Sequence, residues 1–218
     1  MKNYDVILFD LDGTLTDSSP GIINSILYAL KKYNISVKST DELRKFLGPP
    51  LHDSFREFYG FDDEKAIEAI SFYREYFSTK GLLENTVYDG IPKLLQNLKN
   101  SGKRLLLATS KPQEFTDRIM NNFDLTKYFE FIAGSNMDGT RSKKAEVIEY
   151  ALNCCDITDK SNVVMIGDRK HDIIGAETAG IDSIGVEYGY GDYDELCSAG
   201  ATYIAKTVED LENLLNNQ

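Results

Sequence analysis

Short apolar runs that end abruptly in polar residues recur along this chain, and they restrict its fold more than any other feature. They occupy residues 4–9, 104–109, 129–135, 162–168 and 182–186. Because the runs lack the alternation of a strand with one wet face, each predicts a strand buried on both faces. Helix-like or turn segments separate the runs, as expected for parallel strands joined by crossover helices. The sequence therefore predicts an α/β protein with a doubly wound parallel sheet.

Residues 16–85 break this alternation, because they contain helical patterns with no convincing strand between them. One apolar stripe at helical spacing runs through residues 22–30, and a second runs through residues 66–77 and includes Ile67. We therefore expect a Rossmann-like core interrupted by an α-helical subdomain. The core comprises residues 1–15 and 86–218, and the insertion comprises residues 16–85.

Composition excludes some classes of function. Acidic side chains outnumber basic ones by 35 to 24, giving a formal net charge of −11, so binding of nucleic acid through bulk charge is disfavoured. No apolar run approaches the roughly 20 residues of a membrane helix. The 3 cysteines do not suggest a disulfide framework. We expect a cytoplasmic protein with no membrane span and no nucleic-acid partner.

Polar side chains follow the apolar runs at the places where ligands bind in open α/β sheets, beyond the carboxyl ends of the strands. They are Asp10 and Asp12 after the first run, Thr109 and Ser110 after the second, and Asp168 and Asp172 after a later one. Carboxylates that converge on one crevice repel one another unless a cation neutralises them. Oxygen ligands suit Mg²⁺, so these residues predict a Mg²⁺ site.

The segment Asp10-Leu11-Asp12-Gly13-Thr14 resembles the first motif of the haloacid dehalogenase-like hydrolases. Thr109 is similar to the second motif of that family, and Lys143 or Lys144 to the third. Residues 167–172, with the sequence Gly-Asp-Arg-Lys-His-Asp, are similar to the fourth. The motifs follow in the order of the family, and the inserted helices resemble the cap of its phosphoglycolate phosphatase-like branch.

This resemblance implies a Mg²⁺-dependent phosphatase that hydrolyses a small phosphate monoester through an aspartyl phosphate. The substrate would be phosphoglycolate-like, a sugar phosphate or a nucleotide. Asp10 would be the nucleophile, and Asp12 would protonate the leaving alcohol and then accept a proton from water. The metal ligands would be Asp10, Asp12, Asp168 and Asp172, with Asp12 able to contribute its backbone carbonyl.

The remaining phosphoryl oxygens would be bound by Thr109 and by a lysine, which would stabilise charge in the transition state. We prefer Lys144 to Lys143 because of the register of the following helix. Further substrate contacts are expected from Gly13, Thr14, Ser110 and Lys111. Gly13 would also let the backbone turn tightly beside the phosphate.

Three alternatives stay open. A phosphomutase acting on a sugar phosphate would share the four motifs and differ in its cap. A dehalogenase is disfavoured, because a halide leaving group does not need the proton that Asp12 supplies. A non-catalytic module would use the crevice to bind phosphorylated ligands or a partner protein, and it would have no need of Asp12. The expected partner is a small phosphorylated metabolite, and the expected state is a monomer or a homodimer.

Overall fold

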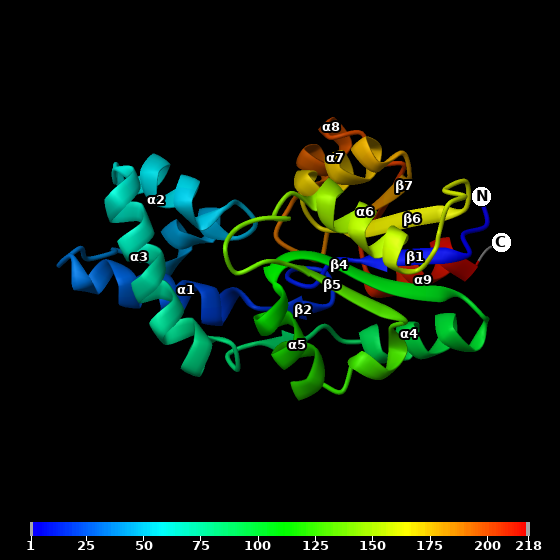
Figure 1. The fold of residues 1–218 in the computed structure, drawn as a ribbon, viewed down its shortest axis with the longest axis horizontal. Coiled ribbons are helices and arrows are strands. Elements are labelled where there is room, and N and C mark those ends of the chain that lie inside the picture. Colours follow the sequence, from blue (N-terminus) through cyan, green and yellow to red (C-terminus); the bar gives the residue numbers. More distant parts are fainter. Residues whose placement is uncertain (1, 217–218) are drawn as a thin grey trace. The chain divides into compact units, whose positions relative to one another are not determined.

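The structure, a computed structural model, describes residues 2–216. Within them the main sheet has six strands in the order β5-β4-β1-β6-β7-β8, and every neighbouring pair is parallel (Figure 1). The strands are β1 (Val6–Phe9), β4 (Arg104–Pro112), β5 (Phe131–Ser135), β6 (Val163–Gly167), β7 (Asp182–Val186) and β8 (Tyr203–Ala205). The predicted doubly wound parallel sheet is confirmed. The edge strand β8 is an addition that the apolar runs did not reveal.

Helices cover both faces of this sheet, as Figure 1 shows. Those on one face are α6 (Lys144–Cys154) and α7 (Lys170–Ala179), and those on the other include α4 (Ile91–Asn100) and α5 (Gln113–Asn122). The short α8 (Tyr193–Ser198) contacts α7, and α9 (Val208–Asn216) contacts β8 and α4. None of the helices in the described part of the chain has the length and apolar character needed to cross a bilayer.

Apolar side chains at helical spacing attach these helices to the sheet. Along α6, Val147, Ile148 and Ala151 are buried, and they belong to one core cluster with Leu8 of β1 and Met165 of β6. The four apolar residues of α4 at positions i, i+3, i+4 and i+7 are also buried. Because the sheet is covered on both sides, the buried parts of its strands are mostly apolar, which is why they could be recognised as continuous runs.

The strand order brings together residues that are far apart in the chain. β1 lies between β4 and β6, and Phe9 at its end is in register with Leu107 and Ile166. The residues that follow these positions must therefore lie along one edge of the sheet. The amide of Asp10 continues the pairing by donating to the carbonyl of Ile166 at 2.9 Å.

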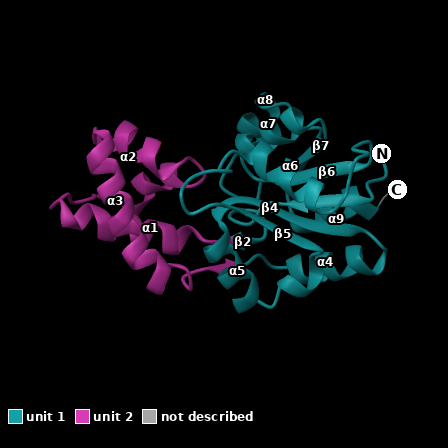
Figure 2. Cartoon of the chain, viewed as in Figure 1, with its two compact units in different colours: residues 1–16, 87–218 teal, residues 17–86 magenta. Residues whose placement is uncertain are grey.

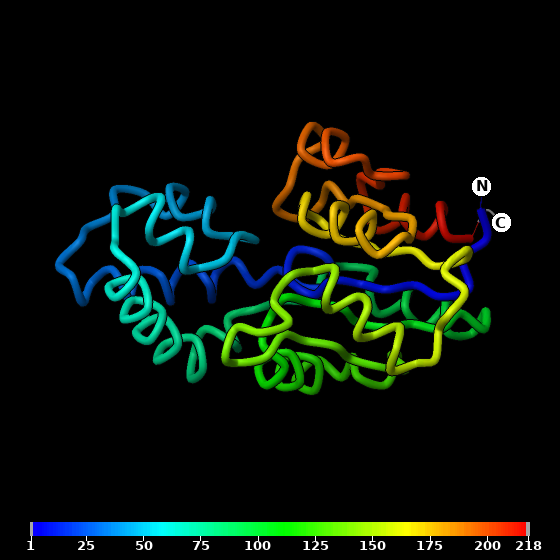
Figure 3. The backbone as a smooth tube through the Cα atoms, turned by 45° about the horizontal axis from the view of Figure 1, so that its top comes forward, coloured from blue at the N-terminus to red at the C-terminus, as the bar shows by residue number. Residues whose placement is uncertain are grey.

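The contacts within the chain divide it into two compact units, residues 1–16 with 87–218 and residues 17–86 (Figure 2). Figure 3 traces the backbone, which passes into the second unit after β1 and returns to the first unit before β4. It contains α1 (Ser19–Lys32), a 3-10 helix (Thr40–Phe46), α2 (Leu51–Tyr59), α3 (Asp63–Tyr76) and a π-helical turn (Phe77–Gly81). The short strands β2 (Thr16–Asp17) and β3 (Thr86–Val87) pair with one another.

One residue of the second apolar stripe was placed wrongly by the sequence pattern. Ile67 is 62% exposed, whereas the buried residues of α3 are Ala66, Ala69 and Tyr73. Successive residues of a helix are rotated by about 100°, so a residue that directly follows a buried one can face solvent. An apolar residue at such a position contributes little to the core.

Two isoleucine substitutions within the insertion test this distinction. Ile26 of α1 is fully buried, and α1 packs against α3. We expect Ile26→Ala to lower the free energy of unfolding by about 2–5 kcal/mol, because it leaves a cavity. Ile67→Ala should change it by less than about 0.5 kcal/mol. Urea titration followed by circular dichroism measures both, and equal losses would contradict the assignment of Ile67 to the exposed face.

Candidate functional site

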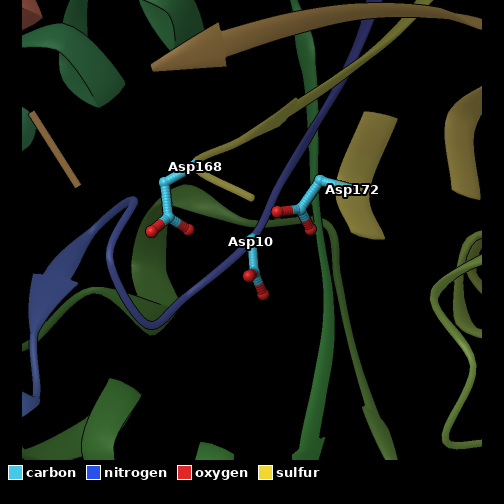
Figure 4. Close-up of side chains that lie close together, drawn as sticks. All are labelled: Asp10, Asp168 and Asp172. Atoms are coloured by element: carbon cyan, nitrogen blue, oxygen red, sulfur yellow. The ribbon is translucent and has the colours of Figure 1, made fainter. Parts of the chain in front are cut away.

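Three carboxylates gather at the carboxyl edge of the sheet. Asp10 follows β1, Asp168 follows β6, and Asp172 lies in the first turn of α7. Each offers an oxygen within 4.8 Å of the others, and Figure 4 shows the three side chains side by side. Their exposed fractions are only 9%, 0% and 1%, respectively. The strand order therefore places three acidic groups in a small space with little access to water.

A buried lysine joins two of these carboxylates. The Nζ of Lys144 lies 2.8 Å from Asp10 Oδ1 and 2.8 Å from Asp172 Oδ1, and it donates to the carbonyl of Ala108 at 3.0 Å. Lys144 is the first residue of α6, and its side chain is almost completely buried. Lys143 precedes the helix and is exposed. Of the two lysines considered from the sequence, Lys144 is the one in contact with the carboxylates.

The electrostatics of this cluster are those of crowded buried acids. Burial raises the pKa of Asp168 well above its ordinary range, and the carboxylates of Asp172 and Asp10 raise it further. The pKa of Asp10 is raised by burial, although the Lys144 ammonium opposes that rise. Burial alone would lower the pKa of Lys144, but Asp10 and Asp172 outweigh it, and the pKa is raised. The lysine therefore stays protonated, whereas Asp10 and Asp168 are poorly stabilised as anions.

The donor set fits a hard divalent cation. All three clustered side chains offer carboxylate oxygens, which are the ligands that Mg²⁺ prefers. Asp168 receives its hydrogen bonds from neutral groups, the Thr14 hydroxyl at 3.4 Å and the Tyr190 amide at 2.8 Å. A cation beside Asp10 and Asp168 would supply the positive charge that Lys144 alone does not provide.

Asp12 occupies a different position. Its Oδ2 lies 2.6 Å from the Nζ of Lys111, and its side chain is more exposed than those of the clustered carboxylates. Among the described residues, the group close enough to share one ion comprises Asp10, Asp168 and Asp172. The carboxylate of Asp12 is therefore outside the cluster, and a metal contact through its backbone carbonyl remains a prediction.

The residues expected to contact the substrate lie in several environments. Gly13 has a positive φ of 81°, and a Cβ there would lie 2.1 Å from an Asp168 oxygen, so the turn requires glycine. Ser110 is exposed, and Lys111 pairs with Asp12. Thr14 is fully buried, and its hydroxyl donates to Asp168. The Thr14 hydroxyl therefore supports Asp168, and a contact of Thr14 with the substrate stays a prediction.

Thr109 lies on the strand beside β1, with only 2% of its surface exposed. Its hydroxyl forms a hydrogen bond with the Asp10 side chain. It also accepts a hydrogen bond from the amide of Lys111 at 3.3 Å. The second motif is thus in direct contact with the first. The hydroxyl faces the carboxylate that the resemblance identifies as the nucleophile.

The sequence reasoning missed a segment that contacts the site from beyond β7. Tyr190 donates its amide to Asp168, and the hydroxyl of Tyr188 donates to the carbonyl of Thr14 at 3.1 Å. Glycines at 189 and 191 bring this backbone close to Asp168. The signal was present: an apolar run ends at Val186 and is followed by the polar and glycine-rich residues 187–191, at the same edge of the sheet.

Residues 7–186 match the family model described as "Haloacid dehalogenase-like hydrolase". A 5'-nucleotidase of Pseudomonas aeruginosa is 43% identical over 214 residues, covering 98% of this chain and 96% of that protein. The tyrosine-protein kinase PtkA of Mycobacterium tuberculosis is 39% identical, covering 98% and 73%. A crystal structure of a predicted phosphatase from Clostridium acetobutylicum aligns with a TM-score of 0.95 at 48% identity, covering 100% of each chain.

Neutralising Asp168 should stabilise the protein when no metal is present. A carboxyl group with a raised pKa in the folded state contributes stability below its unfolded pKa of about 3.9, and this contribution is lost as the pH rises through the folded pKa. Asp168→Asn should therefore have a higher free energy of unfolding than wild type at about pH 7 in EDTA. Its advantage should shrink toward about pH 4.

The measurement is a series of urea titrations across this pH range. Asp5→Asn serves as a control, because the Asp5 side chain is 62% exposed. Mg²⁺ should stabilise wild type and have much less effect on Asp168→Asn. Equal stability of Asp168→Asn and wild type at neutral pH would contradict the like-charge account.

Proposed function

Because this chain belongs to the haloacid dehalogenase-like hydrolases and is a phosphatase of that family, we propose that it hydrolyses small phosphate monoesters with Mg²⁺ through an aspartyl phosphate on Asp10. The observation that carries this proposal is the buried cluster of Asp10, Asp168 and Asp172 around Lys144. A binding module has no need of a nucleophilic carboxylate. Phosphoryl transfer to the protein requires one, and the Lys144 ammonium at 2.8 Å favours the ionised form of Asp10 that attacks.

Two displacements at phosphorus make up the proposed reaction. In the first, an Asp10 oxygen attacks phosphorus and the bond from phosphorus to the leaving oxygen breaks, while Asp12 gives its proton to that oxygen. In the second, water attacks phosphorus and gives a proton to Asp12. The bond between phosphorus and Asp10 breaks, and inorganic phosphate is released. The proton that Asp12 gives in the first step is thus returned to it in the second.

Several groups would assist this transfer. Lys144 holds one oxygen of Asp10 in place and brings positive charge to the phosphoryl group. Thr109, which bonds Asp10, would also bond a phosphoryl oxygen. Asp10 and Asp168, with the carbonyl of Asp12, would hold Mg²⁺. When bound, Mg²⁺ would offset the repulsion between the anionic nucleophile and the anionic substrate.

The substrate class is drawn from the relatives and from the chemistry. A relative that is 43% identical over nearly the whole chain is named 5'-nucleotidase, which makes nucleoside 5'-monophosphates the first class to assay. Sugar phosphates and phosphoglycolate complete the panel. Isomerisation of a sugar phosphate without release of phosphate would indicate a mutase instead. Because another relative is named a kinase, ATP is included, and protein-bound phosphate is measured as well.

The nucleophile is tested with Asp10→Asn. Phosphate release should fall at least about 10³-fold, because the amide cannot form the acyl phosphate. Mass spectrometry after acid quench should find phosphate on the peptide containing Asp10 in wild type and not in this variant. Asp5→Asn, at the opposite end of the same strand, is the matched control and should retain wild-type turnover.

Three results would contradict this proposal. Wild-type turnover in Asp10→Asn would exclude the covalent route. Full activity in excess EDTA would exclude a requirement for Mg²⁺. The absence of phosphate release from every compound in the panel would favour the non-catalytic module.

The two neighbouring lysines give a second matched pair. We expect Lys144→Met to lower turnover at least about 10²-fold, because it removes a charge that stabilises the transition state. The exposed Lys143→Met should stay within about twofold of wild type. Lys144→Arg keeps the charge and separates its loss from general damage, which circular dichroism also monitors. Loss of turnover in Lys143→Met with retention in Lys144→Met would reverse the assignment.

A further inference from the structure

The segment that follows β7, residues 188–191, lies against both the first and the fourth motif. The hydroxyl of Tyr188 donates to the carbonyl of Thr14 at 3.1 Å. Two positions later, the amide of Tyr190 donates to Asp168 Oδ2 at 2.8 Å. The same short segment is therefore bonded to the turn after β1 and to the carboxylate after β6.

Two glycines of this segment leave no room for a side chain. A Cβ on Gly189 would lie 2.3 Å from the Cβ of Asp168 and 2.3 Å from the carbonyl oxygen of Gly13. A Cβ on Gly191 would lie 2.2 Å from the carbonyl oxygen of Asp168. From another side, a Cβ on Gly13 would lie 2.1 Å from Asp168 Oδ2. Backbone thus encloses Asp168 from two directions at van der Waals distance.

Asp168 needs such support because of its charge. It lies beside the carboxylates of Asp10 and Asp172, which repel it, and Lys144 contacts those two. A side chain repelled by its neighbours would rotate away from them unless it were held mechanically and by hydrogen bonds. Thr14 and Tyr190 donate hydrogen bonds to Asp168. The backbone at Gly13 and Gly189 packs against its side chain and limits its rotation.

We propose that residues 188–191 form a clamp that holds Asp168 and the Gly13–Thr14 turn at the separation needed to bind Mg²⁺, with Tyr188 and Gly189 as its positioning residues. This inference rests on the proposed function in naming Mg²⁺. The aromatic ring of Tyr188 is itself fixed, since it packs edge-on against Tyr88 with ring centroids 5.2 Å apart. Its hydroxyl therefore acts on Thr14 from a rigid position.

The clamp makes the binding of Mg²⁺ depend on residues that need not touch the ion. Groups that orient metal ligands typically change metal affinity about 10- to 100-fold when they are removed. Tyr188→Phe removes one hydrogen bond and keeps the ring. Gly189→Ala adds a methyl group that must displace either Asp168 or the first-motif turn.

The first test is calorimetric titration of the metal-free protein with Mg²⁺. Tyr188→Phe should bind Mg²⁺ about tenfold more weakly than wild type, and Gly189→Ala more weakly still. Two control variants carry the same types of substitution at positions outside residues 188–191. Tyr193→Phe alters a tyrosine that is 52% exposed, and Gly185→Ala adds a methyl group that meets the Leu196 side chain at 3.0 Å. Both should stay within about twofold of wild type.

Comparing the Mg²⁺ concentration at half-maximal activity with turnover at saturating Mg²⁺ separates a positioning role of Tyr188 from general damage to the fold. In Tyr188→Phe, the Mg²⁺ concentration at half-maximal activity should rise about tenfold, while turnover at saturating Mg²⁺ should stay within about twofold of wild type. Wild-type Mg²⁺ affinity in both Tyr188→Phe and Gly189→Ala would overturn the clamp. If Gly189→Ala fails to fold, Tyr188→Phe decides alone.

Hydrogen exchange in EDTA tests the clamp without any metal. The Tyr190 amide is bonded to Asp168, so the peptide containing residues 188–191 should be protected in wild type and exchange faster in Tyr188→Phe. Fast exchange of this peptide in wild type, or equal protection in the two proteins, would overturn the clamp. Failure of wild type to bind Mg²⁺ would instead count against the proposed function, and the exchange result would still decide on the clamp.

Discussion

Mutual repulsion among Asp10, Asp168 and Asp172 is the constraint from which most of the site follows. Three carboxylates in a buried space would be costly to ionise. Among the described residues, the ammonium that contacts them is that of Lys144, which meets Asp10 and Asp172. The remaining carboxylate is held by neutral donors and by close backbone. A site of this kind is unfavourable alone, and it would become favourable if a cation entered it together with a phosphoryl group.

The fold makes this arrangement possible through the order of its strands. The two motifs nearest to Asp10 belong to β4 and β6, which pair with β1 on either side. Lys144 comes from α6, which crosses from β5 to β6 over the intervening strands. Each group is thus fixed by an element with a packed apolar face. Precise placement of charged groups on rigid elements is what electrostatic catalysis requires.

Much of this could be predicted from sequence, for a physical reason. A strand buried on both faces is apolar throughout, so its end is marked sharply by the first polar residue, as at Asp10 and Asp168. Those ends must meet at one edge of a parallel sheet. The preference for Lys144 followed from helix register, and Lys144 is the lysine that contacts Asp10 and Asp172.

Other features could not be predicted because they depend on tertiary contacts. The strand β8 is only Tyr203–Ala205, too short for its pattern to be distinctive. The direction of the Thr14 hydroxyl is decided by Asp168, which lies far along the chain. The glycine-rich residues 188–191 mark a loop at the edge of the sheet that carries the site, but they include no acid or lysine, and nothing in their sequence indicates a contact with Asp168. The role of this loop became visible only through the distances from its backbone to Asp168.

A crystal structure of the protein grown with Mg²⁺ and a phosphate analogue tests the central claim most directly. The account predicts an octahedral ion bonded to carboxylate oxygens of Asp10 and Asp168, with the analogue between the ion and Lys144. An ion bound elsewhere, with these carboxylates still facing one another and no density between them at saturating Mg²⁺, would contradict it.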